Sequence, residues 1–295
     1  MDAKKAFSLI YPIQPFFVGN ASVRYLKNTM SDSPIAHFYM YRTSEEAVRS
    51  SVIPDGSIDI VFVCDEDKPY AYLCGPVTEF SEIAIKPGIT RFGVRCHPGV
   101  LPGFLDVAWR EVLNNKYLLS DISDKHRDLT EMIAGAKSFR ERMDLFTRAC
   151  MTDAEKWASP KSEIFGAALA MIFQRKGLLN IDELSENLHY SIRYIDKVFR
   201  NDAGMTPKQY CRTIRFQSLL KKVMAAEGGK KAKLTELAME MGYYDHSHML
   251  REFRFFTTMS PSEYLKNINA AAYFSKVRDF ARAESVTVLN EIPFA

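Results

Sequence analysis

The C-terminal half of this chain contains two copies of one sequence unit, and this repeat constrains the fold more than any other feature. The first copy, LSENLHYSIRYIDKVFRNDAGMTPKQY (Leu184 to Tyr210), aligns with LAMEMGYYDHSHMLREFRFFTTMSPSEY (Leu237 to Tyr264), which has one extra residue before its second helix. Each copy has a leucine, a turn, a helix that ends in phenylalanine, and a later Ser/Thr-Pro-x-x-Tyr segment. Two copies of one supersecondary unit predict a duplicated helical domain.

The first copy contains the parts of a helix-turn-helix unit. Asn180 followed by Glu183 predicts a capping box at the start of a short helix. His189 and Tyr190 provide the turn, and Ser191 is a residue type that caps the next helix. That second helix has an apolar stripe that we expect to be buried, made of Ile195, Val198 and Phe199. Another stripe is charged and contains Arg193, Asp196, Lys197 and Arg200.

A charged helix face is usually only solvated surface. A helix that starts directly at a tight turn is, however, also the element that enters a DNA major groove. The long helix predicted after Thr206-Pro207, which Gly228-Gly229 would end, joins the two copies and sets their separation. Two reading helices held rigidly apart can enter successive major grooves, roughly 34 Å apart along one face of DNA.

The second copy has the same parts and adds the stretch Asp245-His246-Ser247-His248, which contains three potential metal ligands. Residues two apart on a helix differ by about 200°, so the two histidines cannot hold one ion. We therefore predict that Gly242 allows the turn, that Asp245 caps the helix, and that His248 packs or contacts the backbone. The core face is predicted to consist of Met249, Phe253 and Phe256. The other face is predicted to consist of Ser247, Leu250, Arg251 and Arg254.

With these motifs, the stretch from about Ile164 to Leu265 resembles the paired helix-turn-helix domain of AraC/XylS-type transcription regulators. The most specific segment is the second copy with TMSPSEY after it. The resemblance implies that the base-facing residues are Arg193, Asp196, Lys197, His246, Ser247 and Arg251. The arginines and Lys197 suit guanine O6 and N7, and Asp196 either accepts from cytosine N4 or serves in capping or ion pairing. Candidates for phosphate contacts are Arg200, Lys208, Arg212 and Arg254, with Arg215, Lys230, Lys231 and Lys233 as further ones.

Two positions depart from the family pattern. His189 stands in the first turn where the family often has glycine, so a positive φ there would strain the backbone mildly. Thr257-Thr258 replace the usual Phe-Gly near the end of the second copy, and we expect looser packing at that point.

The N-terminal part has the pattern of a β domain. Residues 23–97 contain short alternating or β-branched runs such as HFYMYRTS and SIDIVFV, separated by turn signals such as Pro54-Asp55-Gly56 and Pro87-Gly88. We predict an α+β chain in which a β sandwich or barrel precedes an all-α paired helix-turn-helix domain. The predicted divisions are a β-rich sensor or dimerisation domain (1–120), connecting helices (121–159), the DNA-binding domain (160–270) and an extension of unassigned role (271–295).

Two helical stretches are predicted within the first two divisions. Residues 100–115 have helical spacing, with Phe104, Val107, Ala108 and Val112 on one side. Residues 123–157 read as a helical pair whose apolar stripes favour packing within the chain over a dimer seam.

The β part resembles the cupin-like sensor domain of such regulators in three segments, Val52 to Val63, Cys74 to Phe80 and Arg91 to Gly99. His37 and His97 are too few and too far apart in sequence for the ligand set of a metal-dependent cupin enzyme, and we expect His97 to be a turn residue. An effector pocket is plausible, with Arg91 and Arg95 as buried arginines. Its aromatic candidates are Phe38, Tyr39, Tyr41, Phe62, Tyr70, Tyr72 and Phe92, although any one of these fits equally well in an ordinary core.

Composition sets the remaining limits. The five cysteines are scattered without a C-x-x-C pair, which argues against a disulfide framework or a zinc ribbon and for a reducing, cytoplasmic setting. Pro12 and Pro15 interrupt the N-terminal apolar run, and no apolar run of about 18 residues occurs, so we expect neither a signal peptide nor a membrane partner. Residues 161–270 carry 17 lysines and arginines against 12 acidic residues, the sign expected for a polyanion-binding module.

The leading hypothesis is a DNA-binding transcription regulator that is not an enzyme and needs no cofactor. Its expected partners are double-stranded DNA, RNA polymerase, a small-molecule or protein effector, and a second copy of the chain. A β-domain enzyme or small-molecule binding protein with an appended helical module is the alternative, and a structural adaptor is the third possibility.

Overall fold

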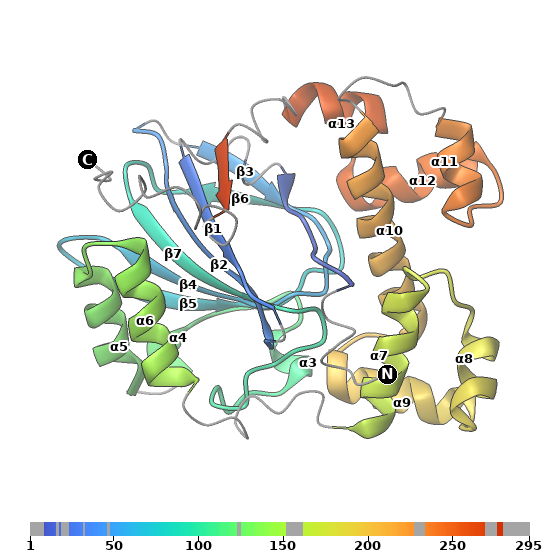
Figure 1. Cartoon of the computed structure of the whole chain (residues 1–295), viewed down its shortest axis with the longest axis horizontal. Helices are drawn as coiled ribbons and strands as arrows, with labels where there is room; N and C mark the ends of the chain where they lie inside the picture. The colour runs from blue at the N-terminus through green and yellow to red at the C-terminus, as the bar shows by residue number, and fades with distance from the viewer. Residues whose placement is uncertain are drawn as a thin grey trace.

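A computed structural model shows a β domain packed beside a helical domain (Figure 1). It describes residues 9–15, 18, 24–31, 33–45, 48–122, 125–151, 162–226, 234–268 and 276–279. No helix in these segments is both long and apolar enough to cross a membrane. The predicted order, a β domain followed by a helical region, is confirmed.

The β domain consists of one large sheet and one small one. The strands are β1 (Arg24–Thr29), β2 (Ile35–Arg42), β3 (Val48–Val52), β4 (Asp59–Cys64), β5 (Tyr70–Cys74), β6 (Ser81–Ile85), β7 (Thr90–Cys96), β8 (Lys116–Leu118) and β9 (Val277–Asp279). The large sheet has the order β8-β5-β4-β7-β2-β1-β9, and β3 pairs with β6 separately. All pairings are antiparallel except that of β1 with β9.

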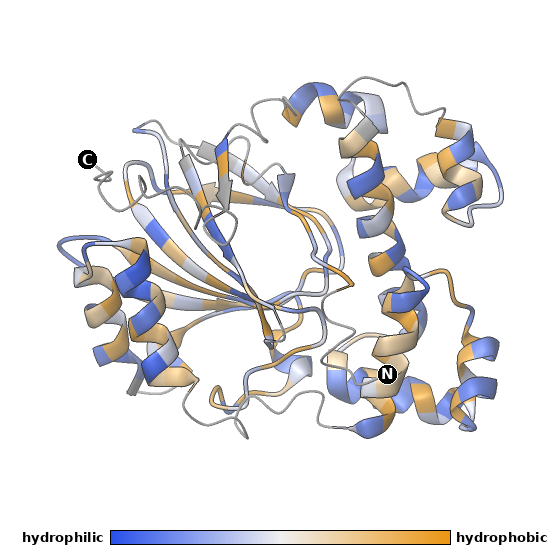
Figure 2. Ribbon diagram, in the orientation of Figure 1, coloured by the Kyte–Doolittle hydropathy of each residue, from blue (hydrophilic) through white to orange (hydrophobic). Residues whose placement is uncertain are grey.

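Alternation along the central strands separates the two faces of the large sheet. On β2, Phe38 and Met40 belong to the main hydrophobic core, whereas Tyr39 and Tyr41 belong to a separate aromatic cluster. Successive side chains of a strand point to opposite faces, so the sheet has a phenylalanine-rich side and a tyrosine-rich side. Figure 2 shows the alternation as bands of different hydropathy along these strands.

Helices cover the phenylalanine-rich side. They are α4 (Leu119–Ile122), α5 (Lys125–Gly135) and α6 (Phe139–Cys150). The ring of Phe146 on α6 packs edge-on against Phe38 and Phe62, with ring centroids 5.9 and 6.1 Å apart. The helical pair predicted near residues 123–157 therefore packs within the chain, as part of the core of the β domain.

The helix predicted over residues 100–115 is wrong in its extent. Only α3 (Trp109–Val112) is helical, and β8 follows it directly. Pro102 has no N–H to donate to a helix and its C=O is used in a turn that accepts from Leu105 N–H. Val100 and Leu105 are nevertheless buried, so the apolar spacing reflected burial in an irregular segment.

The helical domain consists of two three-helix groups that share a long helix. Its helices are α7 (Glu163–Gln174), α8 (Ile181–Leu188), α9 (Ile192–Ala203), α10 (Pro207–Ala226), α11 (Leu234–Glu240), α12 (His246–Thr257) and α13 (Pro261–Ile268). In Figure 1, α10 runs between the lower group, with α7 to α9, and the upper group, with α11 to α13. The predicted duplication is therefore confirmed as two helical units on one shared helix. Gly228-Gly229 and most of 271–295 lie outside the described residues.

The two domains share buried contacts. Gly56 and Gly99 of the β domain lie against Tyr210 of α10. A Cβ added at Gly56 would lie 3.8 Å from the Tyr210 ring, and a Cβ added at Gly99 would lie 3.0 Å from its hydroxyl oxygen. One hydrophobic core cluster includes both Trp109 of the β domain and Phe165 of the helical domain. The helical domain therefore packs on the β domain through its own core residues.

Candidate nucleic-acid interface and sensor cavity

The first helical unit has the predicted caps and turn, but only the Asn180 half of the predicted capping box forms, because the Glu183 carboxylate pairs with Arg175 at 3.3 Å. Asn180 Oδ1 accepts the N–H of Glu183 at 2.6 Å, and Ser191 Oγ accepts the N–H of Tyr194 at 3.3 Å. Between the two helices His189 adopts a left-handed conformation with φ of 58°. These contacts begin α9 directly after a tight turn, as the sequence predicted.

The outward face of α9 carries the first set of predicted reading residues. Arg193 and Lys197 are exposed, and no carboxylate in the described part of the chain pairs with either of them. Asp196 forms an ion pair with Arg200 at 2.7 Å, one helical turn away. The ion-pairing alternative for Asp196 is thus the one that occurs in this structure.

Sequence reasoning overlooked an apolar patch at the start of the same helix. Tyr190, Ile192 and Tyr194 are each more than 40% exposed, and the rings of the two tyrosines are stacked 5.2 Å apart. The patch is uncharged, so the charge pattern that indicates the other candidate residues of α9 does not reveal it. The sequence signal for the patch is Ile192, an apolar residue at the first position of α9.

The Asp245-to-His248 stretch of the second unit closes the start of α12. Asp245 Oδ1 accepts the N–H of His248 at 2.6 Å, and His248 Nδ1 in turn accepts the N–H of Tyr244 at 3.4 Å. Both predictions, a cap for Asp245 and a backbone contact for His248, are confirmed. No group of His, Cys, Asp and Glu side chains among the described residues could hold a metal ion.

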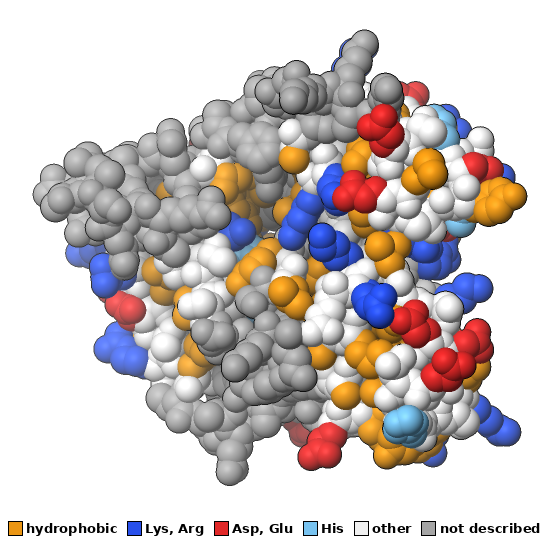
Figure 3. All heavy atoms as spheres, turned by 45° about the vertical axis from the view of Figure 1, so that its right-hand side comes forward, with side chains coloured by type: hydrophobic (Ala, Val, Ile, Leu, Met, Phe, Trp, Pro, Cys, Tyr) orange, Lys and Arg blue, Asp and Glu red, His pale blue; other side chains and the backbone are white. Residues whose placement is uncertain are grey.

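The outward face of α12 carries the second set of predicted reading residues. Ser247, Arg251 and Arg254 are exposed, and His246 is half-buried. Figure 3 shows lysine and arginine side chains spread over the helical domain, with acidic side chains among them.

Among the phosphate candidates, Arg212 is held between two helices of the helical domain. Its guanidinium forms two hydrogen bonds with the carboxylate of Glu252, at 2.7 and 3.1 Å, and lies 4.8 Å from the ring centroid of Phe255. Arg212 therefore joins α10 to α12. Lys208 is exposed, whereas Lys230, Lys231 and Lys233 lie outside the described residues.

The long helix α10 holds both units. It has 20 residues, which corresponds to about 30 Å at 1.5 Å per residue. Phe216 of α10 stacks on Phe256 of α12 at 4.5 Å, and Tyr210 contacts Phe199 of α9 at 5.7 Å. The spacing between the two units is thus set by one rigid element whose length is close to a turn of DNA, about 34 Å.

The end of the second unit is better packed than predicted. Thr257 is fully buried, and its hydroxyl donates to the C=O of Phe253 at 2.7 Å. The same oxygen accepts the N–H of Met259 at 3.2 Å. Thr258 lies in the left-handed region with φ of 64°. The expectation of looser packing is therefore wrong for Thr257, and the departure from the family pattern appears as backbone strain at Thr258.

The tyrosine-rich side of the large sheet faces a cavity of about 410 Å³. Its floor includes Tyr25, Tyr39, Tyr41 and Tyr72, and the small sheet of β3 and β6 contributes to its walls. The ring of Tyr39 lies on Gly93, where any Cβ would overlap it. Of the predicted aromatic residues, the tyrosines therefore line the cavity, whereas Phe38, Phe62 and Phe92 belong to the core under the helices.

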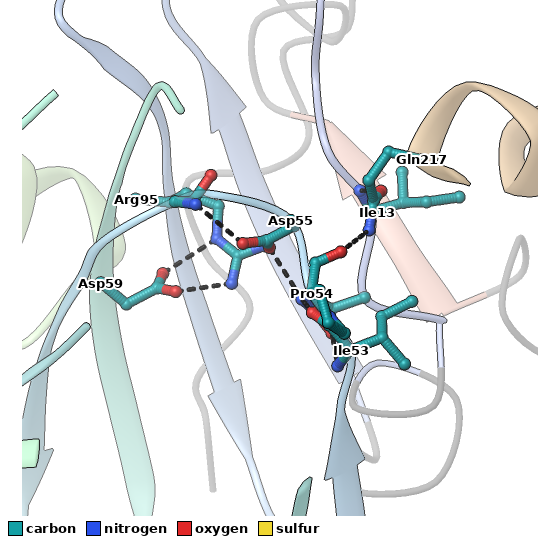
Figure 4. A network of polar contacts seen from close by, with 9 residues as sticks. Ile13, Ile53, Pro54, Asp55, Asp59, Arg95 and Gln217 are labelled. Carbon is teal, nitrogen blue, oxygen red and sulfur yellow. Dashed lines mark hydrogen bonds and ion pairs between the residues drawn. The ribbon is translucent and has the colours of Figure 1, made fainter. Parts of the chain in front are cut away.

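One end of the cavity holds a buried ionic network (Figure 4). Arg95 donates to Asp59 at 3.0 Å and to Asp55 at 2.9 Å, and Gln14 donates to Asp55 at 2.7 Å. Burial raises the pKa of Asp55, while the charge of Arg95 acts in the opposite direction. Burial disfavours the charge of Arg95, but Asp59 and Asp55 outweigh it, and the pKa of the guanidinium is well above its ordinary value.

The segment beside this network reaches the helical domain. Gln217 of α10 is 1% exposed, donates to the C=O of Pro54 at 2.9 Å, and accepts the N–H of Ile13 at 2.9 Å (Figure 4). Ile13 and Asp55 both line the cavity. The wall of the cavity is therefore hydrogen-bonded directly to the helix that joins the two units. Nothing in the sequence singled out Gln217, because its partners are more than 160 positions away.

Comparisons with known proteins support this description. Residues 184–267 match a family of helix-turn-helix domains, and residues 32–117 match a domain family of unknown function. An uncharacterized HTH-type transcriptional regulator from Haemophilus influenzae is 26% identical over 106 residues, which is 35% of this chain and 33% of that protein. The chain thus matches about a third of the length of this curated relative.

Solved structures of ToxT from Vibrio cholerae resemble the fold distantly. One at 1.65 Å resolution has a TM-score of 0.40 and 12% identity, covering 82% of this chain and 98% of that chain. One with an unsaturated fatty acid bound has a TM-score of 0.38 and 15% identity, covering 83% and 94%. Both scores are below 0.5, so we base no conclusion on them. From the family match and the geometry of its caps and turns, residues 184–267 are a helix-turn-helix domain, a kind of domain found in transcription regulators.

Proposed function

We propose that this protein is a sequence-specific transcription regulator of the AraC/XylS type in which α9 and α12 read successive major grooves of DNA. The observation that carries the proposal is the pair of capped turns, each followed by a helix with exposed basic residues, on one rigid helix of about 30 Å. RNA polymerase and a second copy of the chain are further partners in this proposal, and the cytoplasm is its setting.

The reading residues of this proposal follow from exposure and chemistry. Arg193 and Lys197 on α9, and Arg251 on α12, suit guanine O6 and N7, with His246 and Ser247 beside Arg251. Ile192 is exposed at the start of α9 and is our candidate for contact with a thymine methyl group, the apolar feature of the major groove. Asp196 serves to orient Arg200 through their ion pair.

The positioning residues are a separate group. Lys208, Arg200 and Arg254 are exposed and are our candidates for phosphate contacts, which fix the register without reading sequence. We assign Arg212 to packing within the helical domain, because Glu252 already occupies one N–H edge of its guanidinium in a two-bond contact.

We further propose that a signal in the cavity of the β domain, a domain we place with the cupin-like sensors, controls DNA binding. What supports this part is the bonding of Gln217. A ligand that moved Ile13 or the 53–55 segment would act on α10 without any intervening residue. In this proposal the β domain and α10 have two arrangements relative to each other. A ligand shifts the equilibrium between them only by its difference in affinity for the two.

The test is binding of the full chain to duplex DNA enriched from a random-sequence pool, at 50 and 200 mM salt. We expect one enriched site and at least a tenfold loss of affinity at the higher salt concentration. Arg193→Ala and Arg251→Ala should each lose about 1–3 kcal/mol for that site and retain weak non-specific binding. Arg140→Ala, an exposed arginine on α6, is the matched control and should bind like the parent.

If no site is enriched, or if both reading variants bind the site as tightly as the parent, the proposal is wrong. Turnover of a substrate by a chain that fails to enrich DNA would favour the alternative, a β-domain enzyme with an appended helical module.

A further inference from the structure

Each of the two reading helices is preceded by an exposed tyrosine at the same structural position. Ser191 and Asp245 are the N-caps of α9 and α12, and the residue before each cap is a tyrosine, Tyr190 or Tyr244. Tyr190 is 44% exposed and Tyr244 is 92% exposed. The second unit has one extra residue in its turn, and the position of its cap shows that Tyr244, rather than the adjacent Tyr243, matches Tyr190.

Packing accounts for Tyr243 but not for Tyr244. Tyr243 is buried, with its ring edge-on to His248 at 5.4 Å and the guanidinium of Arg215 over the ring at 4.9 Å. A residue that precedes an N-cap often packs against the fourth residue of the helix, which is Met249 in α12. Tyr244 instead extends into solvent, so the packing of the turn does not require its side chain.

Tyr190 is held at the edge of the reading face of α9. Its ring stacks on Tyr194 at 5.2 Å, and Tyr194 lies three residues before Lys197, an exposed cation of that face. Ser185 Oγ donates to the C=O of Tyr190 at 2.6 Å and so holds the backbone of the turn. In the described part of the chain, neither the hydroxyl of Tyr190 nor that of Tyr244 has a hydrogen-bond partner. Both hydroxyls are therefore available to another molecule.

The helix and turn before each reading helix carry no cation. Residues 177–192 contain no lysine or arginine, and neither do residues 234–250. The acidic residues of these two stretches are Asp182, Glu183, Glu186, Glu236, Glu240 and Asp245. In a helix-turn-helix unit the first helix crosses the DNA backbone and the start of the second lies in the groove. Phosphates beside the turn can therefore receive no cation from these stretches, and a side chain that contacts them from the turn must be a neutral donor.

We propose that Tyr190 and Tyr244 are phosphate-contact residues, whose hydroxyl groups donate to DNA phosphates at the rims of the two successive grooves. Tyrosine is among the side chains that contact phosphate oxygens in protein–DNA complexes. The inference rests on the proposed function, in which α9 and α12 read DNA. It adds an uncharged positioning contact at the same place in each unit.

The experiment removes only the hydroxyl groups, with Tyr190→Phe and Tyr244→Phe in the full chain. We expect each variant to bind the enriched DNA site about three- to tenfold more weakly, the range for loss of a neutral hydrogen bond. Binding to a scrambled duplex should weaken by the same factor to within about twofold, because a phosphate contact acts on all sequences alike.

The salt dependence separates this contact from a charged one. The slope of log affinity against log salt concentration should equal that of the parent in both phenylalanine variants, because no cation is lost. Lys208→Ala, which removes an exposed cation, should instead make the slope shallower by about one.

Tyr70→Phe is the matched control. Tyr70 is 37% exposed but lies on β5 of the β domain, so its loss of a hydroxyl should leave DNA affinity unchanged. Duplexes with a single methylphosphonate then locate the partner of each tyrosine. At that position the modified duplex should bind the parent more weakly, and the phenylalanine variant should show little further loss.

Parental affinity in either phenylalanine variant, a weakening confined to the enriched site, or a shallower salt slope would each overturn the inference. If the parent enriches a site, these outcomes concern the tyrosines alone and the proposed function stands. A parent that enriches no site would overturn both.

Discussion

The two helix-turn-helix units have left-handed residues at the same two positions but place their glycines at opposite ends. At the turn, the first unit has His189 with φ of 58°, where the second has Gly242 with φ of 64°. At the end of the reading helix the order is reversed, with Gly204 at 71° and Thr258 at 64°. Both units need two left-handed residues, and each has glycine at only one of them. The geometry of the unit thus dictates the backbone even where the side chain opposes it.

The units also differ in how the β domain holds them. The first unit contacts α3, where Gly204 approaches the C=O of Trp109. The core of the second unit includes Ile53 from the β domain, next to the bond between Pro54 and Gln217. Ile53, in the segment beside the cavity network, therefore belongs to the core of the second unit, whereas α3 and Gly56, which lies beside Tyr210, contact the first unit.

Gln217→Leu should have the largest effect, because it removes the polar tie beside the second unit. It leaves the N–H of Ile13 and the C=O of Pro54 without their partner, at a cost of about 1–3 kcal/mol for each group. Denaturant unfolding of the full chain measures the loss. Gln217→Glu keeps an acceptor for Ile13 but sets a buried carboxylate, which cannot donate, against the C=O of Pro54, so at pH 7 it should lose at least as much. A leucine variant as stable as the parent would mean that this tie does not hold the domains together.

Gly242→Ala should be next, with a loss of about 1–3 kcal/mol in the free energy of unfolding. The residue has a positive φ, and an added Cβ would lie 2.6 Å from Cδ2 of Leu178. Gly135→Ala is the control, since a Cβ there meets nothing within 4 Å, and it should be neutral or slightly stabilising. Equal stability of the two variants would show that the second turn does not need glycine.

Thr258→Gly should stabilise the chain by about 1 kcal/mol, because a β-branched residue is strained at positive φ. His189→Gly should gain less, because histidine tolerates this region better than threonine does. Thermal unfolding of both variants ranks the two strained positions. A loss of stability in Thr258→Gly would mean that the hydrogen bond from its hydroxyl to Thr257 outweighs the strain.

Asp196→Asn should have the smallest effect. It removes the acidic charge from the reading helix of the first unit, and the second unit has an uncharged residue, Leu250, at the matching position. It removes the partner of Arg200, so the first reading helix gains one unpaired cation. We expect a few-fold gain in non-specific DNA affinity and a salt slope steeper by about one phosphate contact. An unchanged slope would indicate that Arg200 lies away from the phosphates.

Features of the helical domain that depend on neighbouring residues were predictable. Asn180, Ser191 and Asp245 are caps, as their residue types and spacing indicated, because a cap bond joins residues only two or three positions apart. The helix predicted over residues 100–115 was wrong, because apolar spacing does not distinguish a helix from a buried irregular segment.

The sequence by itself determined the duplicated helical units, their caps, the apolar stripes and the β-rich character of the N-terminal part, since each follows from contacts within a few residues or from a repeat. Only the tertiary structure decided which arginine of β7 has carboxylate partners, that the tyrosines rather than the phenylalanines line a cavity, and that Gln217 joins this cavity to α10. The physical reason is that these features depend on residues brought together from distant strands and helices, and pairing of that kind leaves no periodic signal along the chain.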